Sequence, residues 1–547
     1  MKRRLRRKVE IDGPFGKTSA YATMTDLPDE LVEKIVEDLD DNGSICRLSL
    51  TCKKLHFLVL PMFFSRNKLV NPQNGLFHCR HPVPELLEAI RTALFVRNLS
   101  SFTFYLTSEI EQVILDISSL RGLLARIPPV GQITIGLPKR IRYIDGSQGV
   151  RTMAKWGREF LKLLETIAES GCRDLRLLDP IGYLSNKFTP NNLNVTIPPP
   201  AKPTGSMSRR TRNSGGFRAH SHLTGMSTIQ VLSSRLFQPF FIGWIIDTLE
   251  VNRESLVCIH LKVTSIDPLL LSRISESINL PAIKEVKISS RFNIVWVGLC
   301  SFLNRHPSTT SLHLEGILPV KDPQIPDPPI ILPYLSQLTA ISPIVTLLLQ
   351  HRNRVPLLSS VHVLLNWNDQ SELDPLAAVA THAHISSLQL SNGIGGDICA
   401  ILNRYIREDK HTRVITSLAH IRSVILDQRI TIHPGKFSPL TIKRWLYLFP
   451  HLEHVTLSLR LLDPRLGLSA EEKRDVVTEF ATQFAADRPT MKTLSVGFIS
   501  AINLDDLRRM PGFKLNEARV GLKVMPVGRW PGPENEIAYF SPAIHLL

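Results

Sequence analysis

The chain has 547 residues and a mass of 61.6 kDa, and 43% of its residues are hydrophobic and 21% charged. This composition excludes a wholly disordered, collagen-like or coiled-coil protein, and the length leaves room for several domains or one long repeat array. The seven cysteines are scattered without a CxxC pair, which argues against a disulfide-stapled secreted protein.

The formal net charge is +16, from 65 Lys and Arg residues against 49 Asp and Glu residues. Residues 1–25 contribute +5 and residues 185–226 contribute +6, so only +5 remains for the rest of the chain. A basic excess points to nucleic acid when it gathers on a folded surface. Because most of this excess lies in two segments without apolar periodicity, we expect a nearly balanced folded body.

Residues 1–25 predict a disordered basic tail. The basic residues at the start of this segment are followed by a polar stretch and not by an apolar one, which argues against a secretion signal. No run of about 18 apolar residues predicts a membrane-spanning helix. We therefore expect no membrane partner and a cytoplasmic or nuclear location, where the tail is basic enough to act as a nuclear-import signal.

Residues 26–64 predict three short helices. Pro28 suits a first helical turn, and Leu31, Ile35 and Leu39 then recur every four residues on one face. The Asp-Asp-Asn-Gly stretch that follows is expected to break this helix. A second helix would hold Ile45, Leu48 and Ser49, and a third would end before Pro61. Three helices in about 38 residues form a marginal core, so we expect the unit to dock on a partner.

This segment resembles the F-box family in order and spacing. The matching residues are Leu27-Pro28-x-Glu30-Leu31, then Ile35, then Leu39, then Leu48-Ser49-Leu50-Thr51-Cys52-Lys53-Lys54-Leu55. The resemblance implies a small all-α F-box that docks on the Skp-type subunit of a Skp-cullin-F-box ubiquitin ligase, while the remaining chain selects the substrate. It assigns the apolar contact with the Skp-type adaptor to Leu27, Pro28, Leu31, Ile35, Leu39 and Leu48, and it implies that Cys52, Leu55 and Leu60 pack inside the unit.

The rest of the chain repeats the pattern apolar-x-x-apolar-x-apolar. Clear or weaker copies end at residues 104, 135, 177, 261, 288, 314, 363, 390, 426, 457 and 496. Three of the spacings are 26 or 27 residues, and helix-like runs lie between the copies, at 156–168, 240–249, 294–304, 376–382, 398–406, 442–449 and 471–486. Strand then helix at such a period predicts an irregular α/β solenoid with parallel strands and outer helices, of the leucine-rich-repeat type.

Two features of the body leave alternatives open. The Asn or Cys that usually follows each strand of such repeats is absent, and an ordinary doubly wound α/β domain produces some copies of so permissive a pattern by chance. The body also resembles the fungal proteins that pair an F-box with degenerate leucine-rich-like repeats. We expect repeats over 85–184 and 227–510, a disordered basic insertion over 185–226, and a C-terminal cap or tail over 511–547. The proline-rich segment 319–333 predicts a linker or surface loop.

No motif for catalysis stands out. The segment Asn392-Gly393-Ile394-Gly395-Gly396 lacks the third glycine of a dinucleotide loop, and the paired histidines at 78/81, 220/222, 382/384 and 451/454 have no second group at zinc-finger spacing. We therefore expect a substrate-recognition adaptor with no catalytic residue, metal or cofactor. Alternatives are a scaffold that works without a ligase and a basic nucleic-acid-associated repeat protein. The sequence does not indicate the substrate protein or the residues that bind it.

Overall fold

The computed structural model divides the chain into two compact units, to which the described residues 27–179 and 225–503 belong respectively. The described residues are 27–69, 72–79, 84–96, 99–127, 129–138, 147–179, 225–237, 239–263, 278–290, 293–320, 330–350, 354–365, 375–392, 398, 418–427, 445–457, 481, 488, 490–496 and 499–503.

The first unit starts with three helices and continues as alternating strands and helices. The helices are α1 (Asp29–Glu37), α2 (Asn42–Ser49) and α3 (Lys53–Arg66). The alternating part is β1 (Leu76–Cys79), α4 (Pro84–Thr92), β2 (Ser101–Tyr105), α5 (Ile110–Leu124), β3 (Gln132–Gly136), α6 (Ser147–Glu169) and β4 (Asp174–Leu178). Strands β1 to β4 pair in sequence order, and every pair is parallel.

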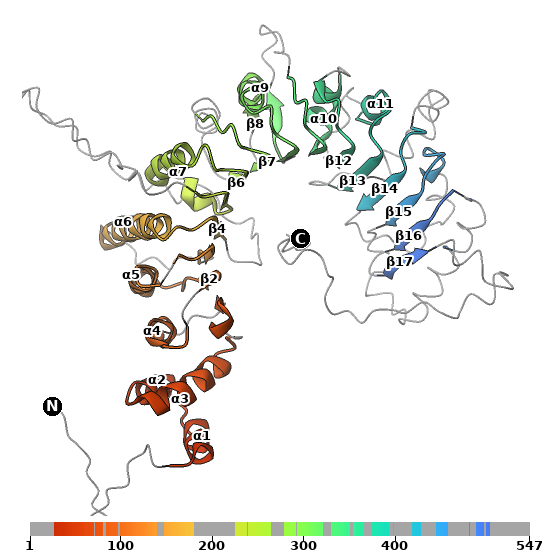
Figure 1. Ribbon diagram of the computed structural model, residues 1–547. Coiled ribbons are helices and arrows are strands. Elements are labelled where there is room, and N and C mark those ends of the chain that lie inside the picture. Colours follow the sequence, from red (N-terminus) through yellow and green to blue (C-terminus); the bar gives the residue numbers. More distant parts are fainter. Residues whose placement is uncertain are drawn as a thin grey trace, which may run out of the picture. The chain divides into compact units, whose positions relative to one another are not determined.

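The second unit repeats the same alternation. Its principal strands are β5 (Thr228–Val231), β6 (Cys258–Val263), β7 (Glu285–Ser290), β9 (Ser311–Glu315), β11 (Gln337–Ile341), β12 (Ser360–Leu365), β13 (Ser387–Asn392), β14 (Ser423–Asp427), β15 (His454–Leu457) and β16 (Thr493–Val496). They pair in this order and all are parallel, whereas β17 (Ile499–Asn503) adds antiparallel to β16. The helices are α7 (Pro239–Val251), α9 (Trp296–Arg305), α10 (Ser342–Leu349) and α11 (Pro375–Ala380). Within each unit the helices lie along one side of the strands (Figure 1).

The repeated apolar pattern is the core of this fold. Its two strand positions pair with their equivalents in the next strand, as Phe102 does with Ile133 and Phe104 with Ile135. In the second unit the first of these positions forms an unbroken buried row of Ile229, Ile259, Val286, Leu312, Leu338, Val361, Leu388, Val424, Val455 and Leu494. Since successive strand residues point to opposite faces, the residues between these positions form a second, open face.

All eleven copies of the pattern that the sequence predicted lie on strands, from β2 to β16. The predicted α/β arrangement of parallel strands with helices is therefore confirmed. The large sheet contains three further parallel strands that the pattern did not predict: β1, which precedes the expected start of the repeats at residue 85, β5 and β11. Strand β11 follows the proline-rich segment, whose first residues form β10 (Leu318–Val320), paired with β8 (Asn293–Val295). The linker prediction was therefore wrong at residues 319 and 320.

Several helix boundaries differ from the predictions. The expected break after the first helix is present: α1 ends at Glu37, before Leu39, and Asn42 and Gly43 begin α2, which Asp41 caps. Helix α3 continues past Pro61 to Arg66. Residues 294 and 295, expected in a helix, belong to strand β8, and α9 begins at Trp296. The predicted tail at 1–25, most of the predicted insertion at 185–226, most of the predicted helices at 398–406 and 471–486, and the C-terminal segment 511–547 lie outside the described residues.

Polar residues at the ends of outer helices link neighbouring repeats. Asn252 follows α7; its side-chain nitrogen donates to the Thr248 carbonyl at 2.9 Å, and its side-chain oxygen accepts the Met226 backbone N–H at 3.0 Å. His306, after α9, contacts Phe302 and Leu280 in the same way. In these two repeats, then, a residue after the helix satisfies a buried backbone N–H that lies before the strand. Among the described residues, no helix is both long and apolar enough to cross a membrane.

Candidate partner-docking site

Helix α1 separates a buried face from an exposed apolar face. Its first turn holds Asp29 and Glu30, whose negative charge suits a helix N-terminus. Val32 and Val36 are buried against the rest of the unit. Leu31 and Ile35, one position earlier in each case, have 47% and 37% of their surface exposed. The hydrophobic stripe on the opposite side is thus available to another protein.

Helices α2 and α3 form the support for α1. The side chain of Asp41 accepts the backbone N–H groups of Gly43 (3.1 Å) and Ser44 (2.8 Å), which satisfies the first turn of α2. A further hydrogen bond from the Ser44 hydroxyl is the main reason why the pKa of Asp41 is lowered. The core comes mainly from α3, which buries Leu55, His56, Val59, Leu60, Phe63 and Phe64.

Two basic side chains of α3 hold the two ends of α1. The Nζ of Lys54 donates to the Leu27 carbonyl at 2.8 Å and lies 3.0 Å from the Asp29 carboxylate. At the other end of both helices, the Arg66 guanidinium donates to the carbonyls of Leu39 and Asp40. The start of α3 thus contacts the start of α1, and the end of α3 contacts the residues that follow α1. The two helices therefore run in the same direction. These contacts use exposed polar groups and leave the apolar stripe of α1 open.

None of the six residues assigned to adaptor contact is buried. Pro28, Leu31 and Ile35 are exposed, and Leu27, Leu39 and Leu48 are half-buried. Of the three residues expected inside the unit, Leu55 and Leu60 are buried and Cys52 is half-buried.

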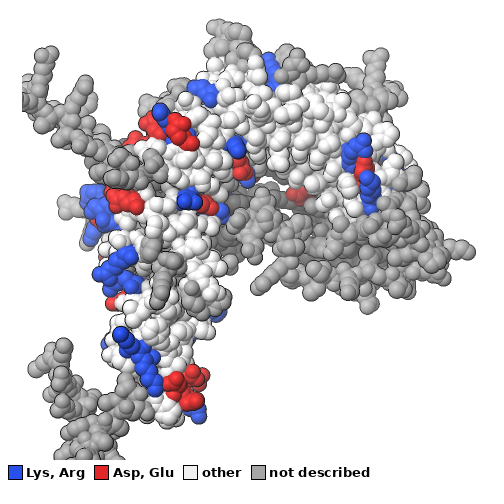
Figure 2. All heavy atoms as spheres, in the orientation of Figure 1, with Lys and Arg blue, Asp and Glu red and all other residues white. Residues whose placement is uncertain are grey.

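Two further exposed apolar residues were not singled out by sequence reasoning. Leu50 directly follows α2 and is 46% exposed, and Phe57 lies on α3 and is 53% exposed. Leu50 stands within the matched motif and Phe57 lies two residues after it, but a linear motif does not show which of its apolar residues face outward. The first turn of α1 also carries the exposed acidic residues Asp29 and Glu30 directly before Leu31, and Figure 2 shows a cluster of red atoms at the end of the first unit where α1 lies. An apolar centre with a charged rim is the usual anatomy of a protein interface.

The open sheet face of the second unit is a second candidate surface. Its central row, on neighbouring strands β6, β7, β9, β11 and β12, consists of His260, Lys287, His313, Thr339 and His362. Burial lowers the pKa of both His260 and His362 to about 4, so these imidazoles are neutral at pH 7. The row therefore offers hydrogen-bonding groups and little net charge.

Carboxylates balance the cations of this face. Lys287 lies 2.9 Å from Glu285 on its own strand. Glu315 lies 3.9 Å from the Nε2 of His313 and accepts the Ser289 hydroxyl at 3.0 Å, and these neighbours hold the pKa of Glu315 down to about 2. The face is thus polar and close to neutral, although the whole chain is strongly basic.

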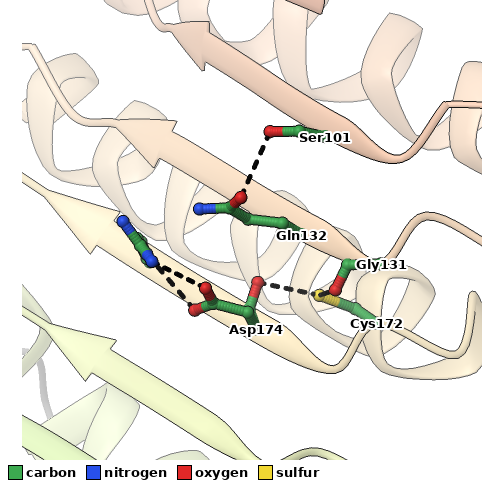
Figure 3. A network of polar contacts seen from close by, with 6 residues as sticks. Ser101, Gly131, Gln132, Cys172 and Asp174 are labelled. Atoms are coloured by element: carbon green, nitrogen blue, oxygen red, sulfur yellow. Dashed lines mark hydrogen bonds and ion pairs between the residues drawn. The ribbon is translucent and has the colours of Figure 1, made fainter. Parts of the chain in front are cut away.

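The open sheet face of the first unit is also polar. Figure 3 shows Ser101, Gln132 and Asp174 at the starts of three neighbouring strands, with a hydrogen bond of 3.4 Å from the Ser101 hydroxyl to Gln132. The Arg176 guanidinium donates two bonds to the Asp174 carboxylate, at 2.8 and 3.3 Å. The Cys172 thiol donates to the Asp174 carbonyl, and burial raises the pKa of Cys172 to about 12, so it stays a thiol.

Neither open face has the side chains of a metal centre. Within the described ranges, no group of three or more His, Cys, Asp and Glu side chains could hold a metal ion. Most of the glycine segment after Asn392 and the histidines at 81, 220 and 222 fall outside those ranges. His382 and His384 have contacting rings but bond to backbone carbonyls.

Comparison with known families agrees with the geometry of the three helices. The model of the F-box domain family matches residues 24–64, which contain α1, α2 and most of α3. No curated protein matches the chain. The chain therefore carries an F-box domain at residues 24–64.

Proposed function

We propose that this protein is a substrate-recognition adaptor of a Skp-cullin-F-box ubiquitin ligase. The observation that carries the proposal is the pair Leu31 and Ile35, large apolar side chains held exposed on α1 of a matched F-box domain. F-box proteins generally work as adaptors and not as enzymes, and an exposed aliphatic stripe on a short helix fits docking into a groove. Burial of such side chains on binding would supply the main part of the affinity.

In this proposal the α/β repeats select the substrate. Support comes from the open sheet face of the second unit, where polar side chains of ten parallel strands stand in rows. Extended repeat surfaces of this kind are common binding surfaces. The neutral, hydrogen-bonding character of the row from His260 to His362 favours a polar substrate segment over a strongly charged one. The chemical identity of the substrate stays open.

The proposal is tested by co-expressing the full chain with a Skp-type adaptor subunit and measuring co-purification. We expect the wild type to retain the adaptor and the Leu31→Ala/Ile35→Ala variant to lose it. The control variant is Ile331→Ala/Leu357→Ala, which removes two other exposed apolar side chains from the second unit; Ile331 is 57% and Leu357 58% exposed. Loss of binding in both variants, or no binding by a folded wild type, would contradict the proposal.

A further inference from the structure

An exposed apolar cluster lies where the F-box helices meet the first strand–helix repeat. It consists of Phe57 on α3 and of Leu94 and Phe95, which follow α4, and we call it the junction patch. Phe57 is 53% and Leu94 56% exposed, and Phe95 is half-buried. The rings of Phe57 and Phe95 lie 6.1 Å apart. Clustered exposed aromatic and aliphatic side chains are typical of protein interaction sites.

The patch is held in place by a buried histidine. The backbone N–H of Leu94 donates to the Nε2 of His56 at 3.0 Å. Because this nitrogen accepts, the proton of the neutral ring is on Nδ1, which lies 3.2 Å from the Ser49 carbonyl. The Phe95 ring also contacts the buried ring of Phe64, at 6.0 Å. The patch is therefore a preformed surface, which loses little conformational entropy when a partner binds.

The junction patch continues the apolar surface of the F-box. Lys54 on α3 bonds to Leu27 at the start of α1, and Phe57 is one helical turn after Lys54 on the same side of α3. A protein seated on Leu27, Pro28 and Leu31 is thus adjacent to Phe57. The Phe57 ring contacts the rings of His56 and Phe95, and about half of its surface is still exposed to a partner.

We propose that the contact with the Skp-type adaptor extends from α1 across the junction patch, so that Phe57 on α3 and Leu94 and Phe95 after α4 are additional adaptor-binding residues. This inference rests on the proposed function and deepens it. It commits to the adaptor subunit as the occupant because the patch is continuous with the proposed docking surface. A site of this kind spans the F-box helices and the segment after α4, so the adaptor would contact both the F-box and the first repeat.

The test is the dissociation constant of the full chain for a purified Skp-type adaptor, measured by titration calorimetry for single variants. We expect Phe57→Ala and Leu94→Ala each to raise Kd by about tenfold or more, as truncation of a buried interface anchor does. Leu115→Ala on α5 is the matched control, because Leu115 is 59% exposed and lies outside the patch. Circular dichroism and the melting temperature check that each variant is folded.

The outcomes separate the two proposals. If Phe57→Ala and Leu94→Ala bind like Leu115→Ala, while Leu31→Ala/Ile35→Ala loses binding, the junction patch is not part of the contact and the adaptor function stands. If the folded wild type does not bind a Skp-type adaptor, both proposals fail. If the patch variants keep adaptor affinity but abolish self-association in light scattering, the occupant is a second copy of the chain and the inference is wrong.

Discussion

The Nε2 atom of His306 accepts a hydrogen bond from the backbone N–H of Leu280, at 2.9 Å. The same ring donates from Nδ1 to the Phe302 carbonyl at 2.6 Å, because a neutral imidazole that accepts at one nitrogen carries its proton on the other. His306 is fully buried. One side chain thus closes the end of α9 and satisfies the backbone of the preceding repeat, as Asn252 does 54 positions earlier.

Replacement of His306 by Leu should therefore destabilise the second unit. The change leaves the buried N–H of Leu280 without its acceptor, which costs about 1–3 kcal/mol. His306→Asn places the side chain used at position 252 in the equivalent site and should lose less stability. Urea unfolding of both variants and the wild type checks this order; equal stability of His306→Leu and the wild type would refute the role of the bond.

Stability should also fall at mildly acidic pH. Burial lowers the pKa of His306, His260 and His362, the last two to about 4, whereas an unfolded histidine titrates near 6.5. Below pH 6.5 the unfolded chain takes up protons that the folded chain does not, so unfolding becomes easier as the pH falls towards 4. The free energy of unfolding should be flat from pH 8 to 7 and decrease from pH 6.5 to 5, where carboxylates contribute little. A constant free energy of unfolding between pH 6.5 and 5 would contradict the lowered pKa values of these histidines.

Two glycines should respond in opposite ways to alanine. Gly316 follows β9 with a φ of +66°, and a Cβ there would come within 2.2 Å of the Ser290 carbonyl oxygen. Gly316→Ala should therefore cost more than about 1 kcal/mol. Gly243 lies inside α7 with open space around its Cα, so Gly243→Ala should stabilise the unit by about 0.5–1 kcal/mol. Melting temperatures of the two variants should lie on opposite sides of the wild type.

Substitution of Arg66 tests whether α3 stabilises the end of α1. Arg66→Ala removes the donors to the carbonyls of Leu39 and Asp40, so the end of α1 should open more often. Hydrogen exchange of peptides covering residues 29–39 should become faster, while peptides from α5 stay unchanged. Lys53→Ala, an exposed change at the start of the same helix, is the control. Unaltered exchange in Arg66→Ala would contradict a role of Arg66 in stabilising the end of α1.

The strands were predictable because a period of two with buried Leu, Ile and Val marks each of them. The missed strands have weaker side chains at the same positions: β11 has Ala340 where other copies have a large aliphatic residue, and β1 has Cys79. Strand β5 carries the full pattern from Met226 to Val231, but its first apolar position, Met226, falls at the end of the segment 185–226 that the composition predicts to be disordered. Met226 is buried, which places it in the fold.

The docking surface was partly predictable for another reason. The spacing of Leu31, Ile35 and Leu39 fixes one helical face, but spacing alone does not tell a face that binds a partner from one that packs inside. The structure separates the two, since Val32 and Val36 are buried and Leu31 and Ile35 are exposed. The junction patch could not be found in this way, because Phe57 and Leu94 are 37 positions apart and meet only through His56 and Phe95.

The central claim is that the chain connects a substrate to a cullin-RING ligase through its F-box. The most direct measurement is recovery of a purified cullin on the immobilised full chain, with and without a Skp-type adaptor. The account predicts recovery only when the adaptor is present, and loss of recovery in Leu31→Ala/Ile35→Ala but not in Ile331→Ala/Leu357→Ala. A folded wild-type chain that recovers no cullin in the presence of the adaptor would contradict it.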